Sequence, residues 1–228
     1  MNDQTTVTSR FDIKDCAPIT LATGRKAVSL TQFRDILATI DPASVYEHFW
    51  GGLLQPRFEE REFNNDFAGW IKHGLHDGIL AEQLAIIDPT DYADLEHLRL
   101  DLIELIDSRL DEAEYLYWAR PTRPFEFLKS QLVVFGTGRS VGSPGELDES
   151  IPHLSLSSLF YHFIDARRRN PDHLDDFRSW LTSLPDDYSD LEEALARIDP
   201  YFGDLAQLRE ELTLAFRQHL GNLAGETS

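Results

Sequence analysis

The sequence predicts a mainly α-helical protein made of two tandem, homologous helical modules with minor strand content, in a pseudo-two-fold arrangement. Two observations lead to this fold class. Landmarks of the first half of the chain return in the second half in the same order, and apolar residues recur at helical spacing through most of both halves. The chain has 228 residues and is 42% hydrophobic, so it is long enough to build a sizeable core.

The repeat emerges when the sequence is shifted along itself by 114 residues (125 − 11), which lays residues 11–49 on residues 125–163. Thr23-Gly24-Arg25 then meets Thr137-Gly138-Arg139, and His48-Phe49 meets His162-Phe163. Further on, "NDFAGW" at 65–70 meets "DDFRSW" at 175–180. We therefore expect helical modules at 11–110 and 125–220, joined by a linker at 111–124 and flanked by flexible tails at 1–10 and 221–228.

Each module is expected to begin with a short strand or hairpin. Phe11 and Ile13 alternate with polar residues at the start of module 1, and Phe125 and Phe127 do the same in module 2. A glycine turn is expected to follow each strand. The two strands could pair with each other across the pseudo-two-fold axis.

Local capping signals predict where the helices begin. Ser29 with Gln32 forms a capping box, and Asp41-Pro42 suits the first turn of a second helix. Asn65 and Asp66 are expected to cap a third helix, as Asp175 and Asp176 are in module 2. A fourth helix and a long amphipathic helix complete each module. The apolar face of the long helix consists of Leu95, Leu98, Leu102, Leu105 and Ile106 in module 1, and of Leu205, Leu208, Leu212, Phe216 and Leu220 in module 2.

Charge and cysteine content limit the partners that the sequence favours. The net charge is −19 at pH 7. Such a surface repels nucleic-acid phosphates and anionic membranes, so we expect neither as a partner, whereas basic partners are favoured. Cys16 is the one cysteine, which fits a reducing cytoplasm. Residues 1–10 lack the apolar stretch of a signal peptide, and no apolar run approaches the roughly 18 residues of a membrane helix.

The most conspicuous candidate site is a stripe of small residues around a repeated histidine. Ser44 and His48 share a helix face in module 1, and Ser158 and His162 do so in module 2. In one interpretation each histidine hydrogen-bonds the capped turn at Asn65-Asp66 or Asp175-Asp176. In the other, the stripe binds a ligand or transfers a proton. A catalytic serine is not expected, since no G-x-S-x-G elbow is present.

Other patterns carry weaker signals. The Thr-Gly-Arg segments could present Arg25 and Arg139 to a phosphate or carboxylate, or could be tight turns with solvated arginines. His73-x-x-His76-Asp77 has a possible metal-ligand spacing, but Ser183 and Asp186 occupy the matching places in module 2, and no metal is expected. The basic run at 167–169 could pair with local acids or bind an acidic partner. No cofactor is expected.

The order of these motifs resembles an uncharacterised prokaryotic family, the domains of unknown function numbered 5752, present here as two tandem copies. The resemblance rests on "TGR", "SLTQF", "SVYEHF", "NNDFAGW", "LAEQLAIIDP" and "LEHLR" and covers residues 11–220. Asp175 departs from the pattern by standing where module 1 has Asn65. The resemblance implies no established activity; it implies an accessory role beside varied enzymes, often of carbohydrate metabolism.

The function that follows from these observations is a non-enzymatic, cytoplasmic protein-interaction or regulatory module with a protein partner. A homo-oligomer is compatible with the same features. The alternative is a small-molecule-binding or enzymatic site built on the Ser-x-x-x-His stripes together with the Thr-Gly-Arg segments.

Overall fold

A computed structural model describes residues 10–54, 62–200 and 203–225, and the side chains up to residue 220. The chain divides into two compact units. Unit 1 combines Met1–Ala17 with Val134–Ser228, and unit 2 is the continuous segment Pro18–Val133. In the part of the chain described, no helix is both long and apolar enough to span a membrane.

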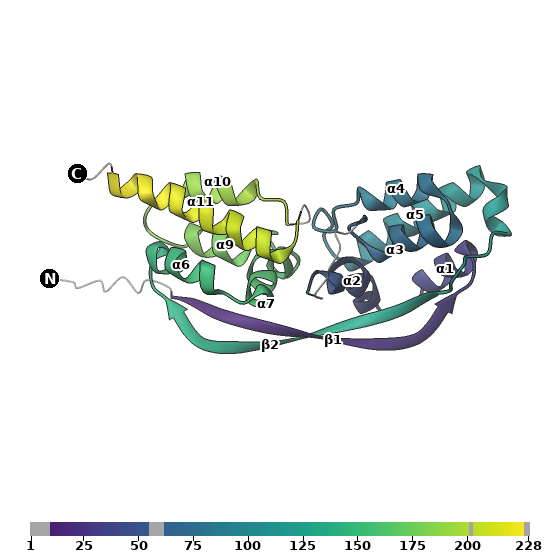
Figure 1. Ribbon diagram of the computed structural model, residues 1–228, viewed down its shortest axis with the longest axis horizontal. Coiled ribbons are helices and arrows are strands. Elements are labelled where there is room, and N and C mark those ends of the chain that lie inside the picture. Colours follow the sequence, from purple (N-terminus) through teal and green to yellow (C-terminus); the bar gives the residue numbers. More distant parts are fainter. Residues whose placement is uncertain (1–9, 55–61, 201–202, 226–228) are drawn as a thin grey trace. The chain divides into compact units, whose positions relative to one another are not determined.

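Two long strands, β1 (Phe11–Ala27) and β2 (Phe125–Val141), form a two-stranded sheet (Figure 1). Their direction is antiparallel, because Thr23 Oγ1 donates to Phe127 O while Thr137 Oγ1 donates to Ile13 O, both at 2.6 Å. The border between the units falls inside both strands, so each unit contains one half of each strand. In each unit the helices lie on one face of its portion of the strand pair (Figure 1).

The predicted fold class, mainly α-helical modules with minor strand content, is wrong. The structure is 57% helical and 17% strand, with a two-strand antiparallel sheet as a major element. The strands are long because the glycines predicted to end them do not. Gly24 (φ +75°) and Gly138 (φ +74°) stay inside β1 and β2. A residue with positive φ inside a strand is typical of a bulge, which lets the strand continue.

The helices of unit 2 begin close to the predicted capping residues. Ser29, Asp41 and Asn65 cap α1, α2 and α3 through their side chains. The elements are α1 (Leu30–Leu37), α2 (Pro42–Trp50), η1 (Gly51–Leu53), α3 (Asp66–Trp70), the π-helix η2 (Ile71–Leu75), α4 (Gly78–Ala85), α5 (Leu95–Glu112) and η3 (Glu114–Tyr117). Thus α5 and η3 extend into the predicted linker at 111–124.

The core of unit 2 includes aromatic residues from the beginning of β2. The Phe33 ring lies 5.1 Å from that of Phe125 and 5.2 Å from that of Phe127, between ring centroids. Phe67 and Trp70 of α3 also contact Phe33. The hydrophobic core therefore joins the helices of module 1 to the first residues of module 2.

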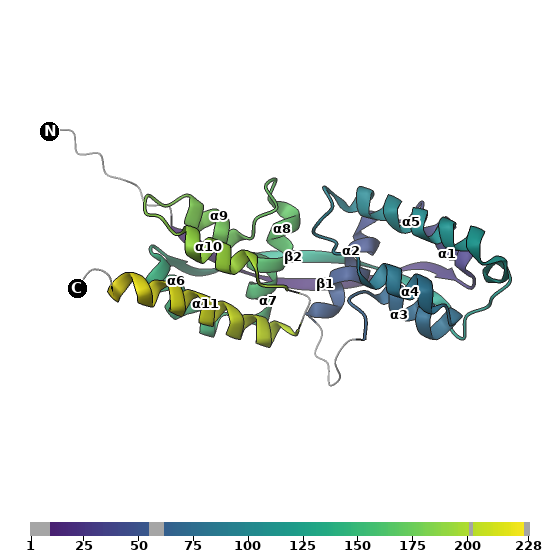
Figure 2. The same cartoon turned by 90° about the horizontal axis from the view of Figure 1, so that it is seen from above.

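Unit 1 contains the remaining helices, among which α10 and α11 lie side by side (Figure 2). The elements are α6 (Pro144–Ser150), η4 (Ile151–His153), α7 (Leu156–Leu159), the π-helix η5 (Phe160–Asp165), α8 (Ala166–Arg169), α9 (Asp176–Thr182), α10 (Ser189–Ala196) and α11 (Leu205–Gly225). The last of these continues past residue 220, where module 2 was predicted to end. Of the predicted tails, 1–9 and 226–228 lie outside the described residues.

The core of unit 1 takes its strand residues from the beginning of β1. Phe11 contacts His162, Phe177 and Trp180, with ring centroids 4.9 to 5.5 Å apart. Each group of helices thus buries the start of the strand that belongs to the other half of the sequence. This exchange explains why the compact units do not coincide with the predicted modules at 11–110 and 125–220.

Candidate functional site

In unit 2 the Ser44-x-x-x-His48 stripe binds the backbone of β2. Both residues lie on α2 and are buried. Ser44 Oγ donates to the carbonyl oxygen of Leu128 at 2.5 Å, and the amide of the same Leu128 donates to His48 Nε2 at 3.1 Å. The two side chains therefore satisfy both backbone polar groups of one strand residue.

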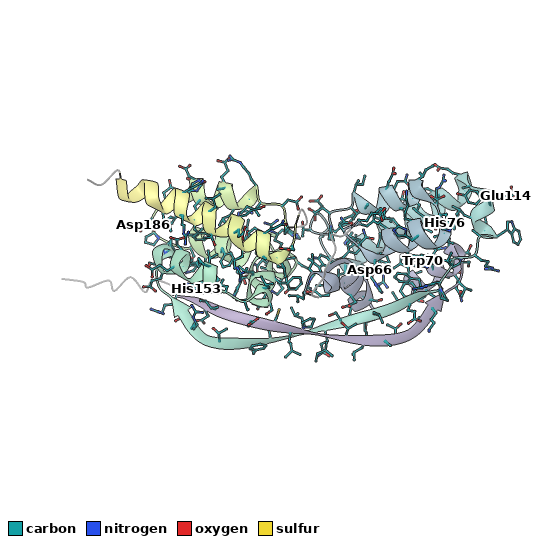
Figure 3. The ribbon with its side chains drawn as sticks, viewed as in Figure 1. Asp66, Trp70, His76, Glu114, His153 and Asp186 are labelled. Carbon is teal, nitrogen blue, oxygen red and sulfur yellow. The ribbon has the colours of Figure 1, made fainter. Side chains whose placement is uncertain are left out.

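The second nitrogen of His48 faces the capped turn at the start of α3. Nδ1 lies 3.1 Å from Asp66 Oδ2, and Asp66 is labelled in Figure 3. Because an amide can only donate, Nε2 must be the acceptor, and the ring proton sits on Nδ1 and points to the carboxylate. The first interpretation of the stripe, a histidine bonded to the capped turn, describes this contact.

Unit 1 contains the same arrangement on β1. Ser158 Oγ donates to the carbonyl of Lys14 at 2.7 Å, and the Lys14 amide donates to His162 Nε2 at 2.9 Å. His162 Nδ1 lies 2.7 Å from Asp176 Oδ2. Burial works against ionisation of Asp176, but hydrogen bonds from His162 and Arg169 outweigh it and lower the pKa of this carboxyl.

We call each serine, histidine and aspartate set a strand anchor: Ser44, His48 and Asp66 in unit 2, and Ser158, His162 and Asp176 in unit 1. An outer strand edge normally presents unpaired amides and carbonyls. The anchor replaces the missing neighbouring strand at one residue. In this geometry the ring nitrogens and the hydroxyl proton are engaged in hydrogen bonds to the backbone and to a carboxylate.

Arg25 and Arg139 are exposed side chains within the strands. In each Thr-Gly-Arg segment the threonine hydroxyl accepts from the arginine amide, at 3.1 Å from Thr23 to Arg25 and 3.2 Å from Thr137 to Arg139. Arg25 Nη2 also lies 3.5 Å from Thr39 Oγ1. Among the described contacts, neither arginine bonds to a strand anchor, so the structure brings together the serine and histidine of each stripe but not the arginines.

A surface hollow of about 480 Å³ lies beside Arg139 in unit 1. Its charged lining consists of Arg10, Arg139, Glu146 and Glu149. The Arg10 guanidinium is already held by Ser140, through Oγ at 2.9 Å and the carbonyl at 2.8 Å. With two basic and two acidic side chains, the hollow does not favour an anion over a cation.

The N-cap residues of α3 and α9 differ between the units. Asn65 accepts from the Ala68 amide, and its Nδ2 donates to the carbonyl of Leu84. Asp175 accepts from the Arg178 amide, but its Oδ2 is buried with no hydrogen-bond partner and lies 3.9 Å from Arg167 Nη2. Burial therefore raises the pKa of Asp175 to about 6.

The basic run at 167–169 pairs with local acids and aromatic rings. Arg168 and Arg169 both bind Asp165, at 2.9 and 3.0 Å, and Arg169 also binds Asp176 at 2.7 Å. The guanidinium of Arg167 lies over the Phe163 ring. Through Asp176, this network also holds the unit 1 anchor in place.

The single cysteine lies on the strand that this anchor binds. Burial raises the pKa of the Cys16 thiol to about 12, so the thiol stays protonated.

The possible metal ligands do not converge. His73 contacts Glu62, His76 has a left-handed backbone, and Asp77 is buried against Arg109. Figure 3 labels His76 in unit 2 and, in unit 1, Asp186, which the predicted repeat aligns with His76. No group of three or more candidate ligands is present among the described residues.

Sequence analysis did not identify the cluster around Asp77. This carboxylate caps α4 through Leu80, and it binds Arg109 at 2.9 Å and the Tyr115 hydroxyl at 2.7 Å. Burial works against its charge, but hydrogen bonds from Arg109, Leu80 and Tyr115 lower the pKa of Asp77. The cluster fixes the segment after α5, where Trp118 is 78% exposed. An aromatic-rich linker, "EYLYW", was the available sequence signal for this surface.

Comparison with known proteins gives a family and a solved structure. The chain matches the model described as "Family of unknown function (DUF5752)" over residues 8–217. One match spans both halves, so the predicted resemblance is confirmed but a second tandem copy is not shown. The chain is also similar to a solved structure titled "The structure of OrfY from Thermoproteus tenax", with a TM-score of 0.78, 26% identity, and coverage of 92% of this chain and 95% of that one. No curated protein matches.

Proposed function

This chain belongs to the family of unknown function DUF5752, and we propose that it acts as a non-enzymatic protein-interaction module of a regulatory or accessory kind in the cytoplasm. The observation that carries the proposal is the exposed aromatic surface of Tyr115, Tyr117 and Trp118 in unit 2. Trp118 is 78% exposed, and the two tyrosines are 56% and 42% exposed. Tryptophan and tyrosine dominate the binding energy of many protein interfaces.

The aromatic surface is held in a fixed backbone conformation. The Tyr115 carbonyl accepts from the amides of Trp118 and Ala119, at 3.1 and 3.0 Å. The Tyr115 hydroxyl is in turn bound by buried Asp77. A side chain that is already ordered loses less conformational entropy on binding, so this geometry supports a docking role.

The chemistry of the anchors supports a role without catalysis. A nucleophilic serine needs a free base, and a general base needs a free ring nitrogen. In both units the serine and the histidine are bound to strand backbone, and the other ring nitrogen is bound to aspartate.

The charge of the chain bears on the kind of partner. At a net charge of −19, the approach of a basic protein is accelerated and that of an acidic one is slowed. We therefore propose a partner with a basic rim around an apolar pocket. The resemblance further suggests an enzyme of carbohydrate metabolism.

The alternative proposal is a small-molecule site. The hollow beside Arg139 supports it, because that arginine belongs to the candidate set. The engaged Ser44, His48, Ser158 and His162 side chains weaken the same proposal. An internal duplication is a further part of our proposal, supported by the two matching strand anchors.

The test is affinity purification of the tagged protein from its own organism, followed by mass spectrometry of the intact complex. We compare the wild type with Trp118→Ala and with the control Leu214→Ala, whose side chain is 56% exposed in unit 1. A stoichiometric partner that is lost with Trp118→Ala and kept with the control is expected. A lone chain carrying an unexplained small mass would favour the small-molecule site. A lone, unmodified chain in several growth conditions would overturn the interaction proposal.

A further inference from the structure

Unit 1 holds a strand segment that is remote in sequence from its helices. The helices lie within Val134–Ser228, whereas the strand bound by Ser158 and His162 belongs to Met1–Ala17. The whole of unit 2 separates these two pieces along the chain. Within unit 1, strand and helices therefore meet as two separate pieces of polypeptide.

The unit 1 anchor recognises its strand through backbone atoms at one position. Ser158 and His162 bind the carbonyl and the amide of Lys14, and the Lys14 side chain is exposed. In unit 2 the residue in the same place is Leu128. Because a lysine and a leucine are held alike, the anchor does not select the side chain of the residue that it binds.

Side chains on either side of the bound residue supply the selectivity. Phe11, Ile13 and Cys16 are buried in unit 1, and Phe125, Phe127 and Ser130 are buried at the same spacing in unit 2. Both anchors thus hold a strand of one pattern: Phe, any residue, Ile or Phe, two further residues, then Cys or Ser. The pattern is short and entirely local, so any strand that carries it can fill the site.

We propose that the unit 1 anchor is an exchangeable strand-binding site that takes the segment 10–17 from a second copy of the chain. Residues 10–17 are connected to the helices of unit 1 only through unit 2, so this segment can leave the anchor while the continuous segment Pro18–Val133 keeps its own core. A second copy at high concentration then competes with the chain's own strand. The exchanged dimer forms the same contacts as the monomer, so the free-energy cost of exchanging the segment is small.

Unit 2 is expected to keep its own strand. Residues 125–130, which its anchor and core hold, lie inside the continuous segment Pro18–Val133. The anchor residues Ser44, His48 and Asp66 lie in the same continuous segment, so no separate folded unit stands between this strand and its anchor. The proposal therefore concerns unit 1 and does not depend on the aromatic surface around Trp118.

The first measurement uses the wild-type chain at concentrations up to about 1 mM, so that a second copy can compete with the chain's own strand. Size-exclusion chromatography with light scattering is expected to show a dimer fraction that grows with concentration. An excess of a synthetic peptide of residues 10–17, with Cys16→Ser to prevent oxidation, is expected to reduce that fraction. The same peptide carrying Phe11→Ala and Ile13→Ala is the control and leaves the dimer unchanged.

The second measurement isolates the anchor. A full-length Phe11→Ala variant weakens the cis strand and is expected to bind the fluorescently labelled peptide more tightly than the wild type does. Adding Ser158→Ala removes one backbone hydrogen bond and should weaken the peptide about 10- to 100-fold. The matched control is Ser157→Ala, whose hydroxyl contacts Ser155 instead of the strand. If Phe11→Ala does not fold, the wild-type measurement decides alone.

Three results would overturn the proposal. One is a chain that stays monomeric at every concentration and ignores the peptide. Another is a dimer that the peptide does not reduce. A third is a monomeric chain that binds the peptide, which would assign the site to a strand from another protein.

Discussion

Asp175 shows how one residue can make two similar helix starts respond differently to pH. It is fully buried, and burial raises its pKa from 3.8 to about 6. Between these pH values the folded state holds a proton that the unfolded state has lost. The contribution of Asp175 to the free energy of unfolding is therefore greatest below about pH 4, falls as the pH rises through about 6, and stays low above it.

The variant Asp175→Asn is expected to remove this pH dependence. Asparagine caps helices as well as aspartate does, and Asn65 fills the same role in unit 2. A shift of this size corresponds to on the order of 3 kcal/mol, so the variant should be more stable than the wild type near pH 7 by up to that amount. Urea unfolding of both proteins from pH 4 to 8 measures the difference. Parallel stability curves would contradict the prediction.

Of the two contacts that each anchor histidine makes, the sequence indicated the one to the capped turn and not the one to the strand. The pairing of His48 with the capped turn at Asp66 was predictable, because a buried imidazole needs a partner and the turn is near in sequence. Its pairing with Leu128 was not, since the two residues are 80 positions apart. No local rule connects a helix face in one half of the chain to a strand in the other.

Among the elements, the helix starts were more predictable than the strands. The caps at Ser29, Asp41 and Asn65 act within three residues, so local chemistry decides them. The strand lengths depend on how glycine is used. In a single sequence, Thr-Gly-Arg indicates a turn, whereas in the structure Gly24 and Gly138 keep a positive φ inside the paired strands β1 and β2. The π-helices η2 and η5 have no sequence signal that we could use.

The glycines of β2 permit a matched test of the need for a positive φ in this strand. Gly138 has a φ of +74°, whereas Gly136 has no positive φ, and a Cβ at either position would meet nothing within 4 Å. Gly138→Ala is expected to destabilise the protein by about 1–2 kcal/mol through backbone strain alone. Gly136→Ala should be neutral or slightly stabilising. Urea unfolding of the two variants measures this, and equal losses would show that the positive φ at Gly138 does not require glycine.

For the molecule as a whole, the predicted repeat and the folded unit have different boundaries. The predicted repeat makes residues 11–110 one module, whereas the structure forms a compact unit from Pro18–Val133. The reason is that the helices of each unit pack on the beginning of the strand from the other half of the chain. Phe125 and Phe127 pack on Phe33 and Phe67 of unit 2, and Phe11 packs on Phe177 of unit 1. Hydrophobic burial acts between any parts of the chain, so the folded units need not follow the order of the motifs along the sequence.

This difference predicts which fragments fold. The segment 18–133 contains the helices of unit 2, its anchor residues and the strand that the anchor holds, so it should fold alone. The segment 11–110 lacks Phe125, Phe127 and Leu128, which leaves an open core and an anchor without a strand. Losing two buried phenylalanines removes about 6–10 kcal/mol, comparable to the whole stability of a small domain.

Two-dimensional NMR and urea unfolding of both fragments measure this difference. The 18–133 fragment is expected to give dispersed amide signals and one cooperative transition. The 11–110 fragment, although it contains one complete predicted module, should give neither. Phe127→Ala in the 18–133 fragment is the control, and it should move that fragment toward the behaviour of 11–110. A cooperatively folded 11–110 fragment would mean that packing of the beginning of β2 on the helices of unit 2 contributes little to stability. In that case the helices of unit 2 would fold without the strand that their anchor binds.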